Sequence, residues 1–181
     1  MQLELDVVVF VPLREPPHRE IDDDPGPEAR LRMCDFATAG DDRFGLSEIE
    51  MERPGPSYTA DTLRELSRRR PGDELFLILG GDEAASLPTT WREPEEVLRL
   101  ATVAAAERDG RRREEIVEAL TALEGGERVV FFDMPRIDVS STLVRRRAAA
   151  GQPIRYLVPD KVANFVGAKS LYGASIPAGA G

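Results

Sequence analysis

Short apolar runs alternate along the chain with longer stretches in which apolar residues recur every three or four positions. The runs rich in Val, Ile, Leu and Phe predict strands at residues 5–12, 44–51, 74–80, 101–107 and 128–133. The stretches with helical spacing predict helices at residues 27–39, 59–70, 113–126, 140–151 and 159–166. Residues 5–12 and 74–80 are apolar at nearly every position, which is typical of parallel strands covered on both faces.

The regular exchange of strand and helix predicts an α/β fold, built as a doubly wound, Rossmann-like parallel sheet. A chain of 181 residues that is 41% hydrophobic is long enough for one domain with a core, which we place at residues 1–172. Residues 173–181 are mostly small and are predicted to form a disordered tail. Ligands of such folds bind beyond the carboxyl ends of the strands, so the loops there are searched for candidate residues.

The composition limits the class of partner. A net charge of −9 opposes an extended nucleic-acid surface, because phosphates would be repelled over most of the protein. No apolar run reaches the roughly 20 residues of a membrane helix, and the first residues lack the basic start of a signal peptide. The single cysteine, Cys34, excludes an internal disulfide and favours a reducing compartment. We therefore expect a cytoplasmic protein that binds small molecules rather than nucleic acid or a membrane.

One candidate residue directly follows a predicted strand. Asp82 stands at the carboxyl end of the strand at 74–80, in the sequence GGDEAASLP. A carboxylate in this position has three possible roles: to hold a metal ion, to accept from a ribose hydroxyl, or only to cap the next helix.

A second candidate group begins the helix at 140–151. The hydroxyls of Ser140, Ser141 and Thr142, the free backbone N–H groups and the positive end of the helix dipole suit an oxyanion. Arg145 lies on the next turn, where its guanidinium can face the same anion. These residues predict a phosphate site, and the alternative is an ordinary capped helix with solvated arginines.

Several motifs resemble, in the right order, those of bacterial nicotinate mononucleotide adenylyltransferases, members of the nucleotidyltransferase α/β-phosphodiesterase superfamily. They are ERPGPSYTADTL (52–63), LILGGD (77–82), LPTTW (87–91) and VSSTLVR (139–145), with VPLREPPHRE (11–20) similar to a further loop. The resemblance covers nearly the whole chain. It implies transfer of AMP from ATP to nicotinate mononucleotide, with Mg²⁺, yielding nicotinate adenine dinucleotide and pyrophosphate in NAD synthesis.

The resemblance also implies roles for individual residues at matching positions. Thr59 and Trp91 would bind the nicotinate half, with Trp91 stacked on the pyridine ring, and the backbone N–H of Arg92 would meet the pyridine carboxylate. The residues that would hold ATP and its phosphates are Asp82, Ser140, Ser141, Thr142, Arg145, His18 and Arg19. Taken without the resemblance, a lone tryptophan is usually a packing residue and a single histidine in a Pro-rich loop is usually exposed.

The chain departs from the family pattern at its start. Family members begin with a strand and GGTFDPxHxGH, whose two histidines bind ATP phosphates, and this sequence has only one histidine and no such segment. By comparison with the pattern, roughly 20–25 residues are missing, about one strand and most of a helix. We therefore assign no catalytic residue, and expect the central strand to be lacking, its neighbours to have open edges and the chain as written to be inactive.

Three hypotheses stay open from the sequence. The first is the adenylyltransferase. The second is a sister nucleotidyltransferase acting on another phosphate acceptor, such as nicotinamide mononucleotide or phosphopantetheine, which the pair of Thr59 and Trp91 opposes. The third is a non-catalytic nucleotide-binding relative that has lost the histidine loop, which the retained serines, Asp82 and Arg145 oppose. Oligomeric state is not predicted.

Overall fold

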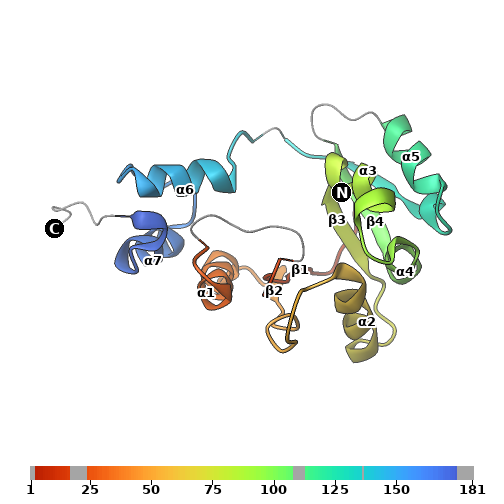
Figure 1. Cartoon of the computed structure of the whole chain (residues 1–181), viewed down its shortest axis with the longest axis horizontal. Helices are drawn as coiled ribbons and strands as arrows, with labels where there is room; N and C mark the ends of the chain where they lie inside the picture. The colour runs from red at the N-terminus through yellow and green to blue at the C-terminus, as the bar shows by residue number, and fades with distance from the viewer. Residues whose placement is uncertain (1–2, 17–23, 108–112, 136, 175–181) are drawn as a thin grey trace. The chain divides into compact units, whose positions relative to one another are not determined.

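A computed structural model describes residues 3–16, 24–107, 113–135 and 137–174 of the chain (Figure 1). The chain forms two compact units. One comprises residues 58–136 with the first four residues, and the other comprises residues 5–57 and 137–181; they are called the central unit and the flanking unit below. None of the helices in the described part of the chain is long and apolar enough to cross a membrane.

The central unit contains a three-stranded parallel sheet in the order β3-β4-β5. Its strands are β3 (Phe76–Gly80), β4 (Thr102–Glu107) and β5 (Val130–Asp133). Its helices are α2 (Thr59–Arg69), α3 (Gly81–Thr90), α4 (Pro94–Leu100) and α5 (Arg113–Thr121), followed by the 3₁₀ turn η1 (Gly126–Arg128). Because α3 and α4 connect β3 to β4 and α5 connects β4 to β5, the central unit has the alternating order that parallel strands require.

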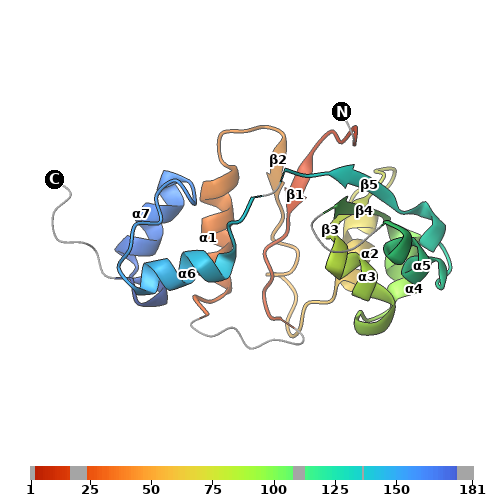
Figure 2. The same cartoon turned by 90° about the horizontal axis from the view of Figure 1, so that it is seen from above.

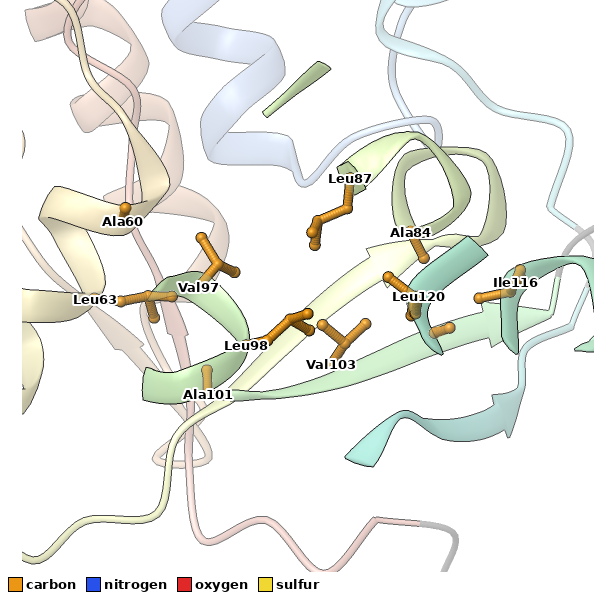
Figure 3. Packing of buried hydrophobic residues seen from close by; sticks show 11 residues of the cluster. Ala60, Leu63, Ala84, Leu87, Val97, Leu98, Ala101, Val103, Ile116 and Leu120 are labelled. Carbon is orange, nitrogen blue, oxygen red and sulfur yellow. The ribbon is translucent and has the colours of Figure 1, made fainter. Parts of the chain in front are cut away.

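The core of the central unit lies between one face of this sheet and the helices. Leu79, Ala105 and Phe131 are register partners across the three strands and line that face. All four helices contribute to the same cluster, as the close view shows (Figure 3). Its most deeply buried side chains are Ala60, Ala84, Leu87, Val97, Val103, Ala105, Ile116 and Leu120. These contacts fix where each helix begins and ends relative to the sheet.

The flanking unit begins with a βαβ arrangement. β1 (Val8–Phe10) and β2 (Phe44–Leu46) pair in parallel, and α1 (Pro27–Thr38) connects them. Near the start of this unit, Arg14 donates from Nη1 to the carbonyls of Met51 (2.7 Å) and Arg53 (3.2 Å). This side chain therefore ties the segment after β1 to the segment after β2.

A helical cluster completes the flanking unit. α1 packs with α6 (Ser141–Ala149), α7 (Asp160–Ala168) and the 3₁₀ turn η2 (Leu171–Gly173), as Figure 1 and Figure 2 show. Ile154, Val162 and Val166 are buried between these helices, and the rings of Phe36 and Phe165 meet edge to face at 5.6 Å.

The α/β class with parallel strands is confirmed, and each predicted strand and helix is present, with shorter bounds in every case except α7, which extends past the predicted end to Ala168. α3 and α4 were not predicted as separate helices. The described strands form two parallel sheets, β1-β2 and β3-β4-β5, rather than one, and the general class of a Rossmann-like parallel fold fits. The single domain at 1–172 and the tail at 173–181 stay predictions.

The prediction that the first and third strands are covered on both faces is wrong. Val9, Phe10 and Ile78 keep 37%, 42% and 42% of their surface exposed. β4 is the buried strand, because it has a partner on each edge and helices against its face. A continuous apolar run does not reveal which strand of a sheet occupies the central position.

The core of the central unit leads to a stability prediction. We expect Leu120→Ala to lower the free energy of unfolding by about 2–5 kcal/mol, because it leaves a cavity at a fully buried position of α5. Val117 lies on the same helix but is 37% exposed, so Val117→Ala should change it by only about 0.5 kcal/mol. Urea unfolding followed by circular dichroism measures both, and equal effects would contradict this account of the core.

Candidate functional site

Asp82 lies where the sequence places it, at the carboxyl end of β3. The N-cap of α3 is Gly80, and Asp82 stands two residues further on with an exposed side chain. The interpretation of Asp82 as the cap of this helix is therefore wrong. In the first helical turn its carboxylate faces the positive end of the helix dipole and is presented at the edge of the sheet where α/β folds bind ligands.

Thr59 and Trp91 occupy the ends of two different helices of the central unit. Thr59 is the first residue of α2, where backbone N–H groups have no partner within the helix. Trp91 is the C-cap of α3, and its backbone N–H bonds to the carbonyl of Leu87 at 3.4 Å. Trp91 is partly buried and packs against the core, so the packing role expected of a lone tryptophan is present. Its position at a helix end also leaves part of the indole accessible.

Tyr58, which precedes Thr59, contacts Arg92, which follows Trp91. The guanidinium carbon of Arg92 lies 4.6 Å from the centroid of the Tyr58 ring. Tyr58 directly precedes Thr59, and Arg92 directly follows Trp91, so this contact joins the start of α2 to the end of α3. The structure thus brings together the three residues predicted for the nicotinate half. Sequence reasoning missed Tyr58, although its position beside Thr59 in PSYTAD was a signal.

Ion pairs between α2 and α4 lie next to the contact between Tyr58 and Arg92. From α2, Arg64 pairs with Asp61 at 2.8 Å, with Glu96 at 2.9 Å and with Glu93. Glu93 adopts the left-handed conformation, φ 54°, as the N-cap of α4, so the chain turns sharply just after Trp91 and Arg92. Arg99 and Arg64 lower the pKa of Glu96 from 4.5 to about 2 through hydrogen bonds, that of Arg99 being the stronger.

The candidate phosphate site in the flanking unit is the first turn and a half of α6. Ser140 is the N-cap, and its Oγ accepts from the backbone N–H of Leu143 at 3.1 Å, as in an ordinary capped helix. Ser141 and Thr142 are exposed, and Arg145 donates from Nη2 to Thr142 Oγ1 at 3.4 Å. Arg145 makes no ion pair with any described carboxylate. Its charge therefore remains available to an anion, and both the phosphate site and the ordinary capped helix with a solvated arginine stay predictions.

The predicted site residues lie in different parts of the chain. His18 and Arg19 lie outside the described residues, so their roles stay predictions. The structure brings together Thr59, Trp91 and Arg92 in the central unit, which also carries Asp82. It brings together Ser140, Ser141, Thr142 and Arg145 in the flanking unit. No three His, Cys, Asp or Glu side chains gather as a metal site among the residues the structure describes.

Comparisons with known proteins identify the family of the chain. Residues 1–147 match the family model described as cytidylyltransferase-like, which defines the class of the protein. A protein of Geobacillus thermodenitrificans named "Probable nicotinate-nucleotide adenylyltransferase" is 39% identical over 172 residues, covering 95% of this chain and 74% of the relative. The chain belongs to the nicotinate-nucleotide adenylyltransferase family.

Solved structures share the fold. Two structures of the Plasmodium falciparum nicotinic acid mononucleotide adenylyltransferase, one complexed with NaAD and one with APC, give TM-scores of 0.74 and 0.71. Each is 14% identical, and each match covers 95% of this chain and 85% of the other. At this identity the likeness establishes the fold alone.

The ion pairs around Glu96 predict a pH dependence. The pKa of Glu96 is lower in the folded state than in the unfolded state, so its carboxylate stabilises the fold fully above the unfolded pKa of 4.5. That contribution is lost as the pH falls through the folded pKa of about 2. We therefore expect Glu96→Gln to lose less stability than the unaltered chain between about pH 6 and about pH 3. Glu95→Gln, at an exposed position of the same helix, should keep the original dependence. Urea midpoints measured at both pH values test this, and parallel curves for all three proteins would refute it.

Proposed function

We propose that this chain transfers AMP from ATP to nicotinate mononucleotide, producing nicotinate adenine dinucleotide and pyrophosphate in NAD biosynthesis. The observation that carries the proposal, beyond family membership, is the contact of Arg92 with the Tyr58 ring, which brings the start of α2 close to the segment that follows α3. A flat aromatic surface, a helix start and a guanidinium in one place suit a pyridine nucleotide with an acidic ring substituent.

The reaction is a displacement at phosphorus. An oxygen of the 5′-phosphate of nicotinate mononucleotide forms a bond to the α-phosphorus of ATP, while the bond from that phosphorus to the β-phosphate oxygen breaks. The leaving pyrophosphate takes the electron pair. Since the attacking phosphate is already an anion, no side chain has to remove a proton, and the protein acts by positioning the reactants and neutralising charge.

Each group of predicted residues has a part in this scheme. Trp91 would stack on the pyridine ring, and the start of α2 at Thr59 would hold the nicotinate half. Asp82 would accept from nucleotide hydroxyls, because a carboxylate at this position repels phosphates. The first turn of α6, through Ser141, Thr142 and Arg145, would bind phosphate oxygens of ATP.

We propose Mg²⁺ as the accompanying ion. Magnesium is usually held by one or two carboxylates, several waters and the phosphates of the substrate, so it needs no protein cage. This fits the described residues, which include the exposed carboxylate of Asp82 but no group of three metal-ligating side chains. When bound, the ion would neutralise charge on the triphosphate. The cytoplasm, where the substrates occur and a lone cysteine stays reduced, is the proposed location.

The proposal is tested by incubating the protein with ATP, Mg²⁺ and nicotinate mononucleotide and separating the products by chromatography. Because the sequence lacks the GGTFDPxHxGH segment, we expect little product from the chain as written, and equal amounts of nicotinate adenine dinucleotide and pyrophosphate once that segment is joined to it. Trp91 is the only tryptophan, so quenching of its fluorescence should report acceptor binding in the same samples. Binding of both substrates without product would favour a nucleotide-binding relative, and product formation from another phosphate acceptor alone would favour a sister transferase.

The phosphate site leads to a separate prediction. Arg145→Ala should weaken ATP binding at least about tenfold, because a charge-assisted hydrogen bond contributes about 1.5–3 kcal/mol. Arg146→Ala, at the exposed next position of α6, serves as the matched control and should leave ATP binding nearly unchanged. Titration calorimetry with ATP and Mg²⁺ measures both dissociation constants, and equal values for the two variants would remove Arg145 from the site.

A further inference from the structure

Tyr172 lies in η2, at the end of the flanking unit, in a backbone conformation that tyrosine rarely adopts. Its φ of 59° is in the left-handed region, which strains any residue that has a Cβ atom. The ring packs against the helical cluster whose buried members include Ile154, Val162 and Val166. Because this packing holds the ring, it also restricts where the hydroxyl group can lie.

The hydroxyl of Tyr172 lies within electrostatic range of Arg145. Burial raises the pKa of Tyr172 above its usual value of 10.0, and the positive charge of Arg145 is the largest influence in the opposite direction. Asp24 and Arg30 have smaller effects, of which the first raises the pKa and the second lowers it. At neutral pH the group is therefore an uncharged O–H that can donate a hydrogen bond. No acceptor for this donor is found among the residues that the structure describes.

The other arginine near this phenol, Arg30, is already engaged by protein groups. Its Nε donates to the carbonyl of Leu13 at 2.8 Å, its Nη2 donates to the carbonyl of Arg14 at 2.6 Å, and its Nη1 pairs with Asp24. Arg145 instead donates one long hydrogen bond, at 3.4 Å, to a hydroxyl of its own helix. The positive charge left open beside the phenol is therefore that of Arg145.

We propose that Tyr172 is a further phosphate-binding residue, whose hydroxyl donates to the anion that Arg145 faces at the start of α6. The inference rests on the proposed function, which assigns phosphate oxygens of ATP to this helix start, and it adds a side chain of η2 to those of α6. A phosphate group has several acceptor oxygens, so one anion can accept from the guanidinium and from the phenol together.

The two donors contribute in different ways. The charge of Arg145 attracts any anion, whereas a hydroxyl on a packed ring donates in a restricted direction. Ser141 and Thr142 are exposed, so their hydroxyls turn freely toward water, while the Tyr172 side chain is half-buried. Less rotamer entropy is therefore lost when Tyr172 binds a ligand than when a free side chain does.

The chain offers a matched control for this residue. Tyr172→Phe removes only the hydroxyl and keeps the ring in the cluster. Tyr156→Phe makes the same change at a tyrosine of the same unit that also has a left-handed φ, 68°, but is 92% exposed. Titration calorimetry with ATP and Mg²⁺, and with inorganic triphosphate alone, measures the dissociation constants of both variants and the unaltered chain. Urea unfolding of the same three proteins measures their stability.

We expect Tyr172→Phe to weaken the binding of ATP and of inorganic triphosphate about tenfold, because each loses a hydrogen bond to a charged acceptor. The urea midpoint of this variant should equal that of the unaltered chain. Tyr156→Phe should leave both dissociation constants and the midpoint unchanged.

Three outcomes would overturn the inference. Equal affinities of Tyr172→Phe and the unaltered chain would remove the hydroxyl from the phosphate site, while ATP binding by both would leave the proposed function standing. Weaker binding together with a lower urea midpoint would show that the hydroxyl supports the fold of η2 instead. Failure of the unaltered chain to bind ATP or triphosphate would refute the phosphate site at α6, and this inference with it.

Discussion

The packing of α3 and α4 against β4 is the constraint on which the position of Trp91 and Arg92, the residues proposed to bind the acceptor, depends. Val103 and Ala105 of β4 are small enough for helices to approach closely, and Leu87 of α3 and Val97 of α4 are fully buried in the same cluster. With both helices fixed, the short segment between them has little freedom. The turn at Glu93 follows, and Trp91 and Arg92 are presented at the surface rather than buried within the cluster.

Charge is distributed so that a few cations stay available in an acidic protein. The chain carries a net charge of −9, and arginines such as Arg64 and Arg68 are paired with nearby carboxylates. Arg145 instead bonds to a hydroxyl, and Arg92 shares its carboxylate with another arginine. Among the described residues, Arg145 and Arg92 are therefore two cations whose charge is not fully neutralised by a carboxylate.

Local patterns predicted the elements well, because strand runs, helix periodicity and the Ser140 cap depend on residues close in sequence. The separate helix α4 was missed, since its N-cap is a glutamate in the left-handed conformation, which no local preference indicates. The exposure of Phe10 and Ile78 was also missed, because the edge strands of a sheet are decided by distant pairings. The contact between Tyr58 and Arg92 was missed for the same reason. Both residues stand in the sequence, but only the fold brings them together.

Three of the predicted site residues, Thr59, Asp82 and Ser141, lie in the first turn of a helix, where the helix dipole has its positive end. Thr59 and Ser141 are the first residues of α2 and α6, where N–H groups and a hydroxyl favour an anion. Asp82, in the first turn of α3, places a negative charge at the positive end of that helix, so this start is suited to hydroxyl donors instead. A dinucleotide product contains both kinds of group, phosphates and ribose hydroxyls. The difference between Asp82 and the hydroxyl residues is therefore a physical reason for assigning sugar and phosphate contacts to separate helices.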